Sequence, residues 1–179
     1  MTETVPQEQS TARPGRFRLW PHLAGAGAVA IACGIVAALG TLVTTTLSGQ
    51  PLLAVTAGLY NLLIWTMAAS IPALIGWLPL YLLFQHTHAD RLPRLVRNLT
   101  PGAVVGIAVM WLAAEGLPSI GRLLAGAAIG LFVGYTGEKT VRWAQSRAKI
   151  GFDFGLLIGI LVLGVAVMSN FYLQQALHN

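Results

Sequence analysis

The sequence predicts an all-α membrane protein, a polytopic transmembrane helical bundle with five spans. Three observations carry this: the composition, the length of uncharged chain and the placement of basic residues. Of the 179 residues, 55% are hydrophobic and 9% are charged, whereas a soluble domain is usually about 25% charged. The stretch 19–89 contains no Lys, Arg, Asp or Glu. Because about 20 apolar residues in a helix cross the roughly 30 Å core of a bilayer, this stretch alone is long enough to cross twice.

The first apolar segment, 23–47, follows a polar N-terminal stretch. Residues 1–21 are expected to form a disordered cytoplasmic tail, because they hold too little apolar surface to fold. The segment is longer than the roughly 7–15 apolar residues of a signal peptide. Residues 30–33 loosely resemble a lipoprotein cleavage box, but the apolar run continues past Cys33. We therefore interpret 23–47 as a retained first span.

The second apolar segment, 52–84, is too long for one straight crossing and too short for two. As a helix it would be about 50 Å long. Pro72 and Pro79 each remove a backbone donor and favour a kink. We expect one crossing over 62–84, preceded by an interfacial or tilted half-helix at 52–61. A functional discontinuity of the kind found in transporters is the alternative explanation of this break.

Three further spans follow. The third, 101–114, is expected to begin at Pro101, and the fourth, 119–137, has Ser119 as a plausible N-cap. A tight turn between them predicts a short helical hairpin. The fifth span is 154–173, and residues 175–179 would form a short outer tail. A single transmembrane domain, 22–174, therefore accounts for the chain beyond its N-terminal tail.

The basic residues predict how the chain is oriented. With the N-terminus inside, the cytoplasmic segments are 1–21, 85–100 and 138–153, which hold ten of the eleven basic residues; only Arg122 lies outside them. The positive-inside rule then predicts a cytoplasmic N-terminus and an outer C-terminus, in what we expect to be a bacterial inner (plasma) membrane. The net charge of +5 is interpreted as topology and contact with anionic headgroups. The expected partner is thus the lipid bilayer and not nucleic acid.

Small residues recur at four-residue spacing, which places them on one helix face where backbones can approach closely. The glycines expected to pack helices are Gly34, Gly102, Gly106, Gly126, Gly130, Gly134, Gly151, Gly155 and Gly159. We expect the glycine faces of 119–137 and 154–173 to pack against each other. The stripe of Ala26, Ala30, Gly34 and Ala38 on the first span is the candidate surface for another membrane subunit or a second copy of the chain.

Polar residues within membrane spans are costly and often functional, and this chain has few of them. Glu115 and Arg122 flank the turn between the third and fourth spans. They could pair across it, either to gate or bind an ion or simply to fix the hairpin. Asn61, with Thr and Ser side chains on the first two spans, could line a polar path. Ser and Thr, however, more often bond to carbonyl groups of their own helix.

We predict no catalytic residue, no cofactor and no metal ion. His22, His86 and His88 gather at the expected cytoplasmic boundary, but a metal site needs three or four ligands with further support. Cys33 is the one cysteine, which excludes a disulfide within one chain. The phosphate-binding loop and the His-Glu-x-x-His helix motif are both absent from the sequence.

The first functional hypothesis is a non-catalytic accessory, assembly or immunity-type subunit that acts through helix–helix contacts in the bilayer. It rests on the small-residue faces, the few buried polar groups and the short loops. A small solute or ion transporter working as an oligomer is the alternative, motivated by the prolines of 52–84 and by Asn61. A small membrane enzyme using loop residues is the third. A polar path through the bundle would favour the transporter over the subunit.

Overall fold

The computed structural model describes residues 19–87, 93–114, 117–147 and 151–178. Regular structure in these residues is helical throughout, and five of the described helices are long and apolar enough to cross a bilayer. The prediction of an all-α chain with five apolar helices is therefore confirmed for this part of the molecule. In chain order the elements are α1 (Leu19–Leu47), α2 (Pro51–Pro72), η1 (Ala73–Trp77), α3 (Leu78–Thr87), α4 (Arg94–Leu112), α5 (Ile120–Gln145) and α6 (Phe152–His178).

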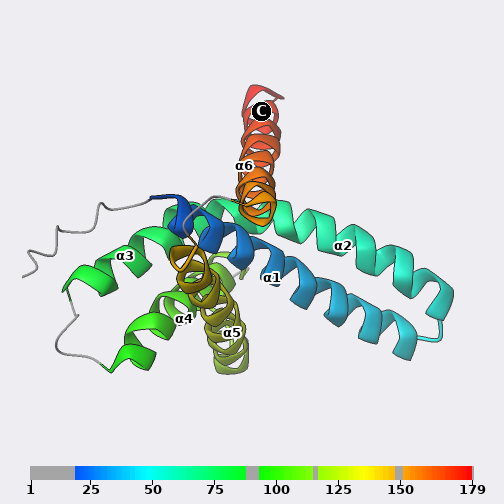
Figure 1. Ribbon diagram of the computed structural model, residues 1–179. Helices are drawn as coiled ribbons and strands as arrows, with labels where there is room; N and C mark the ends of the chain where they lie inside the picture. Colours follow the sequence, from blue (N-terminus) through cyan, green and yellow to red (C-terminus); the bar gives the residue numbers. More distant parts are fainter. Residues whose placement is uncertain (1–18, 88–92, 115–116, 148–150, 179) are drawn as a thin grey trace, which may run out of the picture.

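Helices α1 and α2 form a long antiparallel hairpin (Figure 1). Its turn uses Gly49 in the left-handed backbone region (φ 81°), which glycine adopts without steric cost. Gly34 of α1 lies against α2, where a Cβ at this position would be 2.6 Å from the carbonyl oxygen of Leu62. Ala26 and Ala30 are fully buried. The small-residue stripe of the first span thus faces the chain's own core, and its assignment to an outside partner is wrong.

The helix that follows the turn is continuous from Pro51 to His86. Between Pro72 and Pro79 it contains a π-helical segment, η1, in which the N–H of Leu78 bonds to the carbonyl of Ala73. A proline has no donor for the carbonyl four residues earlier and crowds that carbonyl, so Pro79 disturbs the turn that η1 occupies. Single turns of this kind are the usual form of π-helix inside an α-helix. The chain therefore stays helical where we expected a separate half-helix at 52–61 and a crossing at 62–84.

Helices α4 and α5 form the second hairpin, and glycines line their contact. A Cβ at Gly134 would lie 3.0 Å from the Cα of Gly102, and one at Gly126 would lie 2.7 Å from the carbonyl oxygen of Gly106. A Cβ at Gly130 would lie 2.8 Å from the carbonyl carbon of Gly102. Backbone therefore touches backbone along this hairpin, as expected for small residues at membrane helix interfaces.

Helix α6 packs across α1 and α2 and projects away from the rest of the molecule (Figure 1). Two close crossings hold it: Leu157 lies over Gly27 of α1, and Gly164 lies over Ser70 of α2. Around Gly151, Gly155 and Gly159, no described atom lies within 4 Å of where a Cβ would be. The expectation that the glycine faces of the fourth and fifth spans pack together is therefore wrong; α5 uses its glycines against α4.

The helices also extend further than their apolar segments. Helix α1 begins at Leu19, within the stretch expected to be tail. Helix α4 begins at Arg94 and has Pro101 in its interior, and α5 continues to Gln145. The expected cytoplasmic loops at 85–100 and 138–153 are thus largely helical. Polar residues that we had assigned to those loops consequently lie on helix faces that pack against one another.

The glycine contacts predict the stability of two matched variants. Gly130→Ala should lower the free energy of unfolding by about 1–3 kcal/mol, because the new methyl group would force α4 and α5 apart. Gly155→Ala should be neutral or stabilising by up to about 1 kcal/mol, since alanine is the better helix former and the site is open. Unfolding midpoints in mild detergent would compare the two, and equal midpoints would contradict the α4–α5 contact.

Candidate functional site

A chain of polar side chains joins three helices at one end of the bundle. Gln85 of α3 donates a hydrogen bond from Nε2 to Oδ1 of Asn98 on α4 (2.6 Å). The Nδ2 of Asn98 donates to Oε1 of Glu138 on α5 (2.6 Å). The same carboxylate oxygen forms an ion pair with Nη2 of Arg142, one helical turn further along α5. This polar chain links α3, α4 and α5 through side chains alone.

The central members of the polar chain are buried. Asn98 is 3% exposed and Glu138 is 5% exposed, whereas the side chain of Arg142 is 55% exposed. A buried carboxylate without partners is strongly destabilising, and a charge in an apolar membrane protein is retained only where it is paired. Asn98 and Arg142 supply these partners. The exposed guanidinium of Arg142 places this end of the site in contact with water or headgroups.

The glycine register brings Asn98 and Glu138 together. In the antiparallel α4–α5 hairpin, Gly102 lies against Gly134. Asn98 precedes Gly102 by four residues and Glu138 follows Gly134 by four residues, so each polar side chain stands one turn beyond the contact on the same face. The two side chains are therefore neighbours because the backbones touch one turn away.

Stacked aromatic rings pack close to the polar chain. The rings of Trp77 and Tyr81 stack with centroids 4.9 Å apart, and the ring of His22 lies 6.0 Å from that of Tyr81. Trp77 and Tyr81 are 1% and 4% exposed. Trp77 also touches α5, where a Cβ at Gly137 would lie 2.7 Å from its ring. Both rings belong to the hydrophobic core, so the buried part of the polar chain lies at the edge of that core.

A cavity of about 380 Å³ opens beside the polar chain, between α1, α3, α4 and α5. This volume falls within the range of sites for small ligands. Its polar lining residues are His22, Tyr81, Gln85, His86, Arg97, Asn98, Arg142 and Gln145. Asp and Glu are absent from the described residues that line it. The arrangement can therefore bind a polar ligand through amide, imidazole and guanidinium donors.

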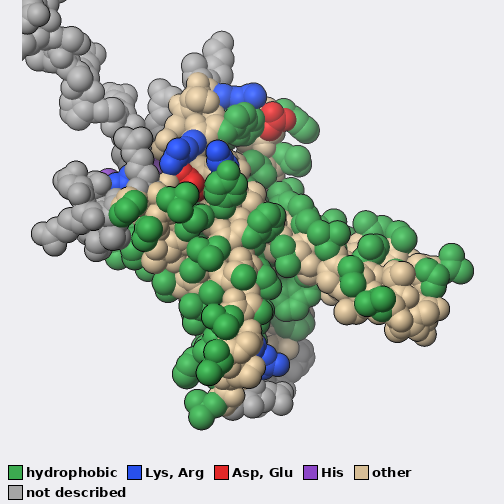
Figure 2. Space-filling model, turned by 90° about the horizontal axis from the view of Figure 1, so that it is seen from below, with side chains coloured by type: hydrophobic (Ala, Val, Ile, Leu, Met, Phe, Trp, Pro, Cys, Tyr) green, Lys and Arg blue, Asp and Glu red, His purple; other side chains and the backbone are tan. Residues whose placement is uncertain are grey.

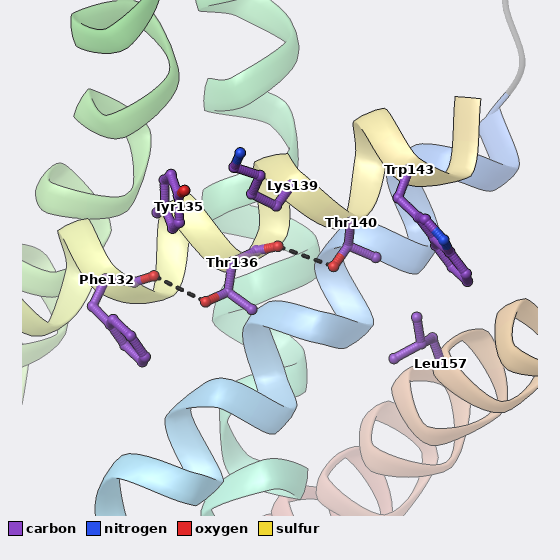
Figure 3. Close-up of a pocket in the computed structure, with 7 residues that line it drawn as sticks. All are labelled: Phe132, Tyr135, Thr136, Lys139, Thr140, Trp143 and Leu157. Carbon is purple, nitrogen blue, oxygen red and sulfur yellow. Dashed lines mark hydrogen bonds between the residues drawn. The ribbon is translucent and has the colours of Figure 1, made fainter. Parts of the chain in front are cut away.

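A second, apolar groove of about 510 Å³ lies between α5 and α6 (Figure 3). Its lining comes from the face of α5 opposite the glycines, including Phe132, Tyr135 and Trp143, and from Leu157 of α6. Trp143 stacks on Phe154 at 5.2 Å between ring centroids. Phe132 and Tyr135 are exposed, so Trp143 is the ring shown to meet α6. Where α5 meets α6 in this way, it presents a bulky ring and not a glycine.

The polar residues singled out from the sequence lie elsewhere. Arg122 is exposed at the opposite end of α5 from Glu138, where its backbone N–H donates to Oγ of Ser119 (3.3 Å). Glu115 lies outside the described residues, so the proposed Glu115–Arg122 pair stays a prediction. Asn61 donates to the carbonyl of Ala57 in its own helix (3.2 Å).

Several hydroxyl groups of α1 and α2 also bond to their own helices. Thr44, Thr46 and Ser70 donate to carbonyl groups three or four residues earlier, at 2.7–3.1 Å. Such bonds make these hydroxyl groups less available to line a polar path. The buried Ser and Thr hydroxyl groups of the described core belong to Thr66 and Ser70, and its hydrophobic cluster includes Val29, Val133 and Leu161.

Two of the three histidines meet as the sequence suggested. His22 is buried at the start of α1, His86 is exposed near the end of α3, and both line the cavity. His88 lies outside the described residues. Among the residues described, no group of three or more His, Cys, Asp or Glu side chains is placed to hold a metal ion. The site's donors and its one buried carboxylate suit a hydrogen-bonding ligand.

Sequence reasoning missed Gln85, Asn98, Glu138 and Arg142. Glu138 and Arg142 are four residues apart with opposite charge, a spacing typical of an ion pair on one helix. That signal indicated that the helix continues past Gly137, but the basic residues nearby favoured a loop. Comparisons with protein-family models, with curated proteins and with solved structures find no match to this chain.

The ion pair between the buried Glu138 and the half-exposed Arg142 predicts the order of stability of three proteins: the wild type, a single variant and a double variant. Arg142→Gln should lower the free energy of unfolding by about 1–3 kcal/mol, because the buried carboxylate of Glu138 loses its charged partner. Adding Glu138→Gln should recover part of that loss, since no buried charge then remains unpaired. Unfolding midpoints of the single and double variants test this order. A double variant less stable than Arg142→Gln alone would show that the carboxylate does not depend on Arg142.

Proposed function

We propose that the chain is a non-catalytic subunit of a bacterial inner membrane that works by assembling with another membrane protein or with a second copy of itself. The observation that carries this proposal is the uncovered glycine face of α6. The chain places glycines at close helix contacts in α1, α4 and α5, yet Gly155 and Gly159 of α6 have no described atom near them. Small residues four apart are the usual contact surface for association of membrane helices.

The pattern of exposure along α6 supports the same proposal. Large apolar side chains flank the two glycines on the exposed side, including Leu156, Val162 and Leu163, each more than half exposed. Leu156 and Leu163 are seven residues apart, about two helical turns, so they lie on one face of α6, which suits a neighbouring helix packed against that face. Lipid tails can also cover such a face, but the backbone beside Gly155 and Gly159 offers them no side chain to contact.

The alternatives receive less support. A transporter needs a polar path, and Thr46, Asn61 and Ser70 of α1 and α2 bond to carbonyl groups of their own helices instead. A membrane enzyme needs reactive groups facing one another. The buried carboxylate of Glu138 is held by Asn98 and Arg142, and these partners leave its bonded oxygen no role as a base.

We also propose that the N-terminus faces the cytoplasm and the C-terminus faces the outer side. Arg122 and Arg142 stand at opposite ends of α5, about 30 Å apart along the helix, which matches the core of a bilayer. Lys139, Arg142 and Arg147 share one end, and Figure 2 shows most Lys and Arg side chains gathered in one region while hydrophobic side chains cover much of the projecting arms. The positive-inside rule places that basic end in the cytoplasm.

Reporter fusions test the orientation. A fusion after Arg147 should report the cytoplasm, and fusions after Gln50 and after Asn179 should both report the outer side. Basic segments stay on the cytoplasmic side of the membrane, and this sets the direction in which each span crosses. A cytoplasmic signal from the Asn179 fusion would rule out an odd number of crossings and, with it, this arrangement.

Two glycine variants test the assembly. Gly155→Leu and Gly40→Leu both add a branched side chain at a helical glycine with nothing described within 4 Å, so both should leave the monomer folded. Gly155→Leu should reduce assembly about tenfold or more, because the new side chain would hold a partner helix off the α6 backbone. Gly40→Leu, on α1, should leave assembly unchanged.

Chemical cross-linking in intact membranes, followed by size measurement in mild detergent, gives the readout for both variants. A cross-linked species whose mass is a multiple of the chain's own would identify a second copy, and any other mass would identify a different subunit. A wild-type chain that stays monomeric and uncross-linked in membranes would remove the proposal. Because the alternative is a transporter that works as an oligomer, solute flux in proteoliposomes would favour it only where the chain self-associates.

A further inference from the structure

We propose that the cavity between α1, α3, α4 and α5 binds a phosphate-bearing anion at the basic end of the bundle. This goes beyond assembly through α6, because it assigns a ligand to a different surface of the molecule. The cavity measures about 380 Å³ and is lined by two guanidinium groups, Arg97 and Arg142, and by two imidazoles, His22 and His86. Guanidinium groups bind phosphate oxygens in a planar, often bidentate manner.

The nearby carboxylate does not oppose an anion in the cavity. Glu138 is not among the lining residues, and its Oε1 accepts from Asn98 and pairs with Arg142. Asn98 therefore stands between the carboxylate and the cavity. Its own amide is oriented by the bond from Gln85, so that its Oδ1 accepts and its Nδ2 donates. The negative charge of Glu138 is buried outside the cavity, whereas the described side chains that line the cavity are positively charged or neutral.

The guanidinium of Arg142 has N–H donors that its ion pair with Glu138 does not use. Its ion pair with Glu138 uses Nη2, and the side chain is 55% exposed. A guanidinium has five N–H donors in a rigid fork, so the carboxylate on one edge leaves the other edge for a ligand. The carboxylate also fixes the orientation of the fork. Arg142 is thus held in place before a ligand arrives, which reduces the entropy lost on binding.

The position of the cavity agrees with a phosphate ligand. It lies at the last turns of α3 and α5, the same end as Lys139 and Arg147. A basic pocket between transmembrane helices at the cytoplasmic surface is the environment in which headgroups of anionic lipids bind. The phosphate can belong to a lipid headgroup or to a small soluble anion. Both sources present the same oxygens to Arg97 and Arg142, and the experiment below distinguishes them.

The variant His86→Glu places a negative charge at the cavity. It should leave the fold intact, because His86 is exposed. Arg147→Glu is the matched control: it lies at the same end, outside the cavity, against the ring of Trp143. It changes the net charge by more than His86→Glu does. If binding depends on the cavity, His86→Glu should weaken it about tenfold and Arg147→Glu by less than about twofold.

Two probes identify the source of the phosphate. Phosphatidylglycerol bound to the detergent-solubilised full chain is measured by native mass spectrometry, and inorganic phosphate by isothermal titration calorimetry. Binding of phosphatidylglycerol alone, weakened by His86→Glu, assigns a lipid headgroup. Binding of inorganic phosphate that competes with the lipid assigns a soluble anion. Equal weakening by the two variants would show that only the surface charge attracts the anion, and binding of neither probe would overturn the proposal outright.

Discussion

The close approach of helix backbones at glycine is the constraint on which the rest of the structure depends. Helices in a bilayer gain little from burying apolar surface against each other, because lipid is equally apolar. Contact must come from packing, and glycine allows the shortest separation. At Gly102 and Gly130 the α4 and α5 backbones touch, and Gly25 and Gly137 allow α1, α5 and Trp77 to meet at one place. The glycines therefore decide which helices are neighbours.

The same contacts also decide where polar groups can be buried. Asn98 and Glu138 stand one turn from the α4–α5 glycine contact, so the close helices leave no room for water between them. The carboxylate must then be satisfied by side chains, and Asn98 and Arg142 do this. A shift of one helix relative to the other would break the Asn98–Glu138 bond. The polar chain consequently fixes the register that the glycines permit, which is an established use of buried polar groups.

Sequence reasoning identified the helical elements because a long apolar segment can satisfy its backbone in a membrane only as a helix. It predicted helices that are shorter than those of the structure. Residues 94–100 and 138–145 are polar enough to resemble loops, although Glu138 and Arg142 have the spacing that places two side chains on one helix face. The sequence did not predict these helix ends, because apolar composition marks only the part of a helix that lies in the membrane core. A helix can continue into the headgroup region as long as its backbone hydrogen bonds can form.

The pairing of helices was less predictable, since α5 has a single glycine face and both α4 and α6 offer glycines to meet it. The opposite face of α5 decides between them. Phe132, Tyr135 and Trp143 occupy that face, and bulky rings do not allow backbones to approach as closely as glycines do. The glycines therefore face α4, and Trp143 meets α6 through Phe154. The spacing of the glycines in the sequence does not predict this pairing. The pairing depends on which face of α5 each neighbouring helix packs against in the folded protein.

Helix α6 and the cavity stand at different places on the molecule, and this separation follows from how α6 is held. Leu157 over Gly27 and Gly164 over Ser70 fix α6 to the α1–α2 hairpin. Neither crossing involves α4, but α6 also touches α5, because Phe154 stacks on Trp143, the residue after Arg142. Gly155 and Gly159 lie outside these contacts. The proposed surface for a partner and the cavity at Arg142 therefore use different residues, while the Trp143–Phe154 stack joins α6 to the helix that carries Arg142.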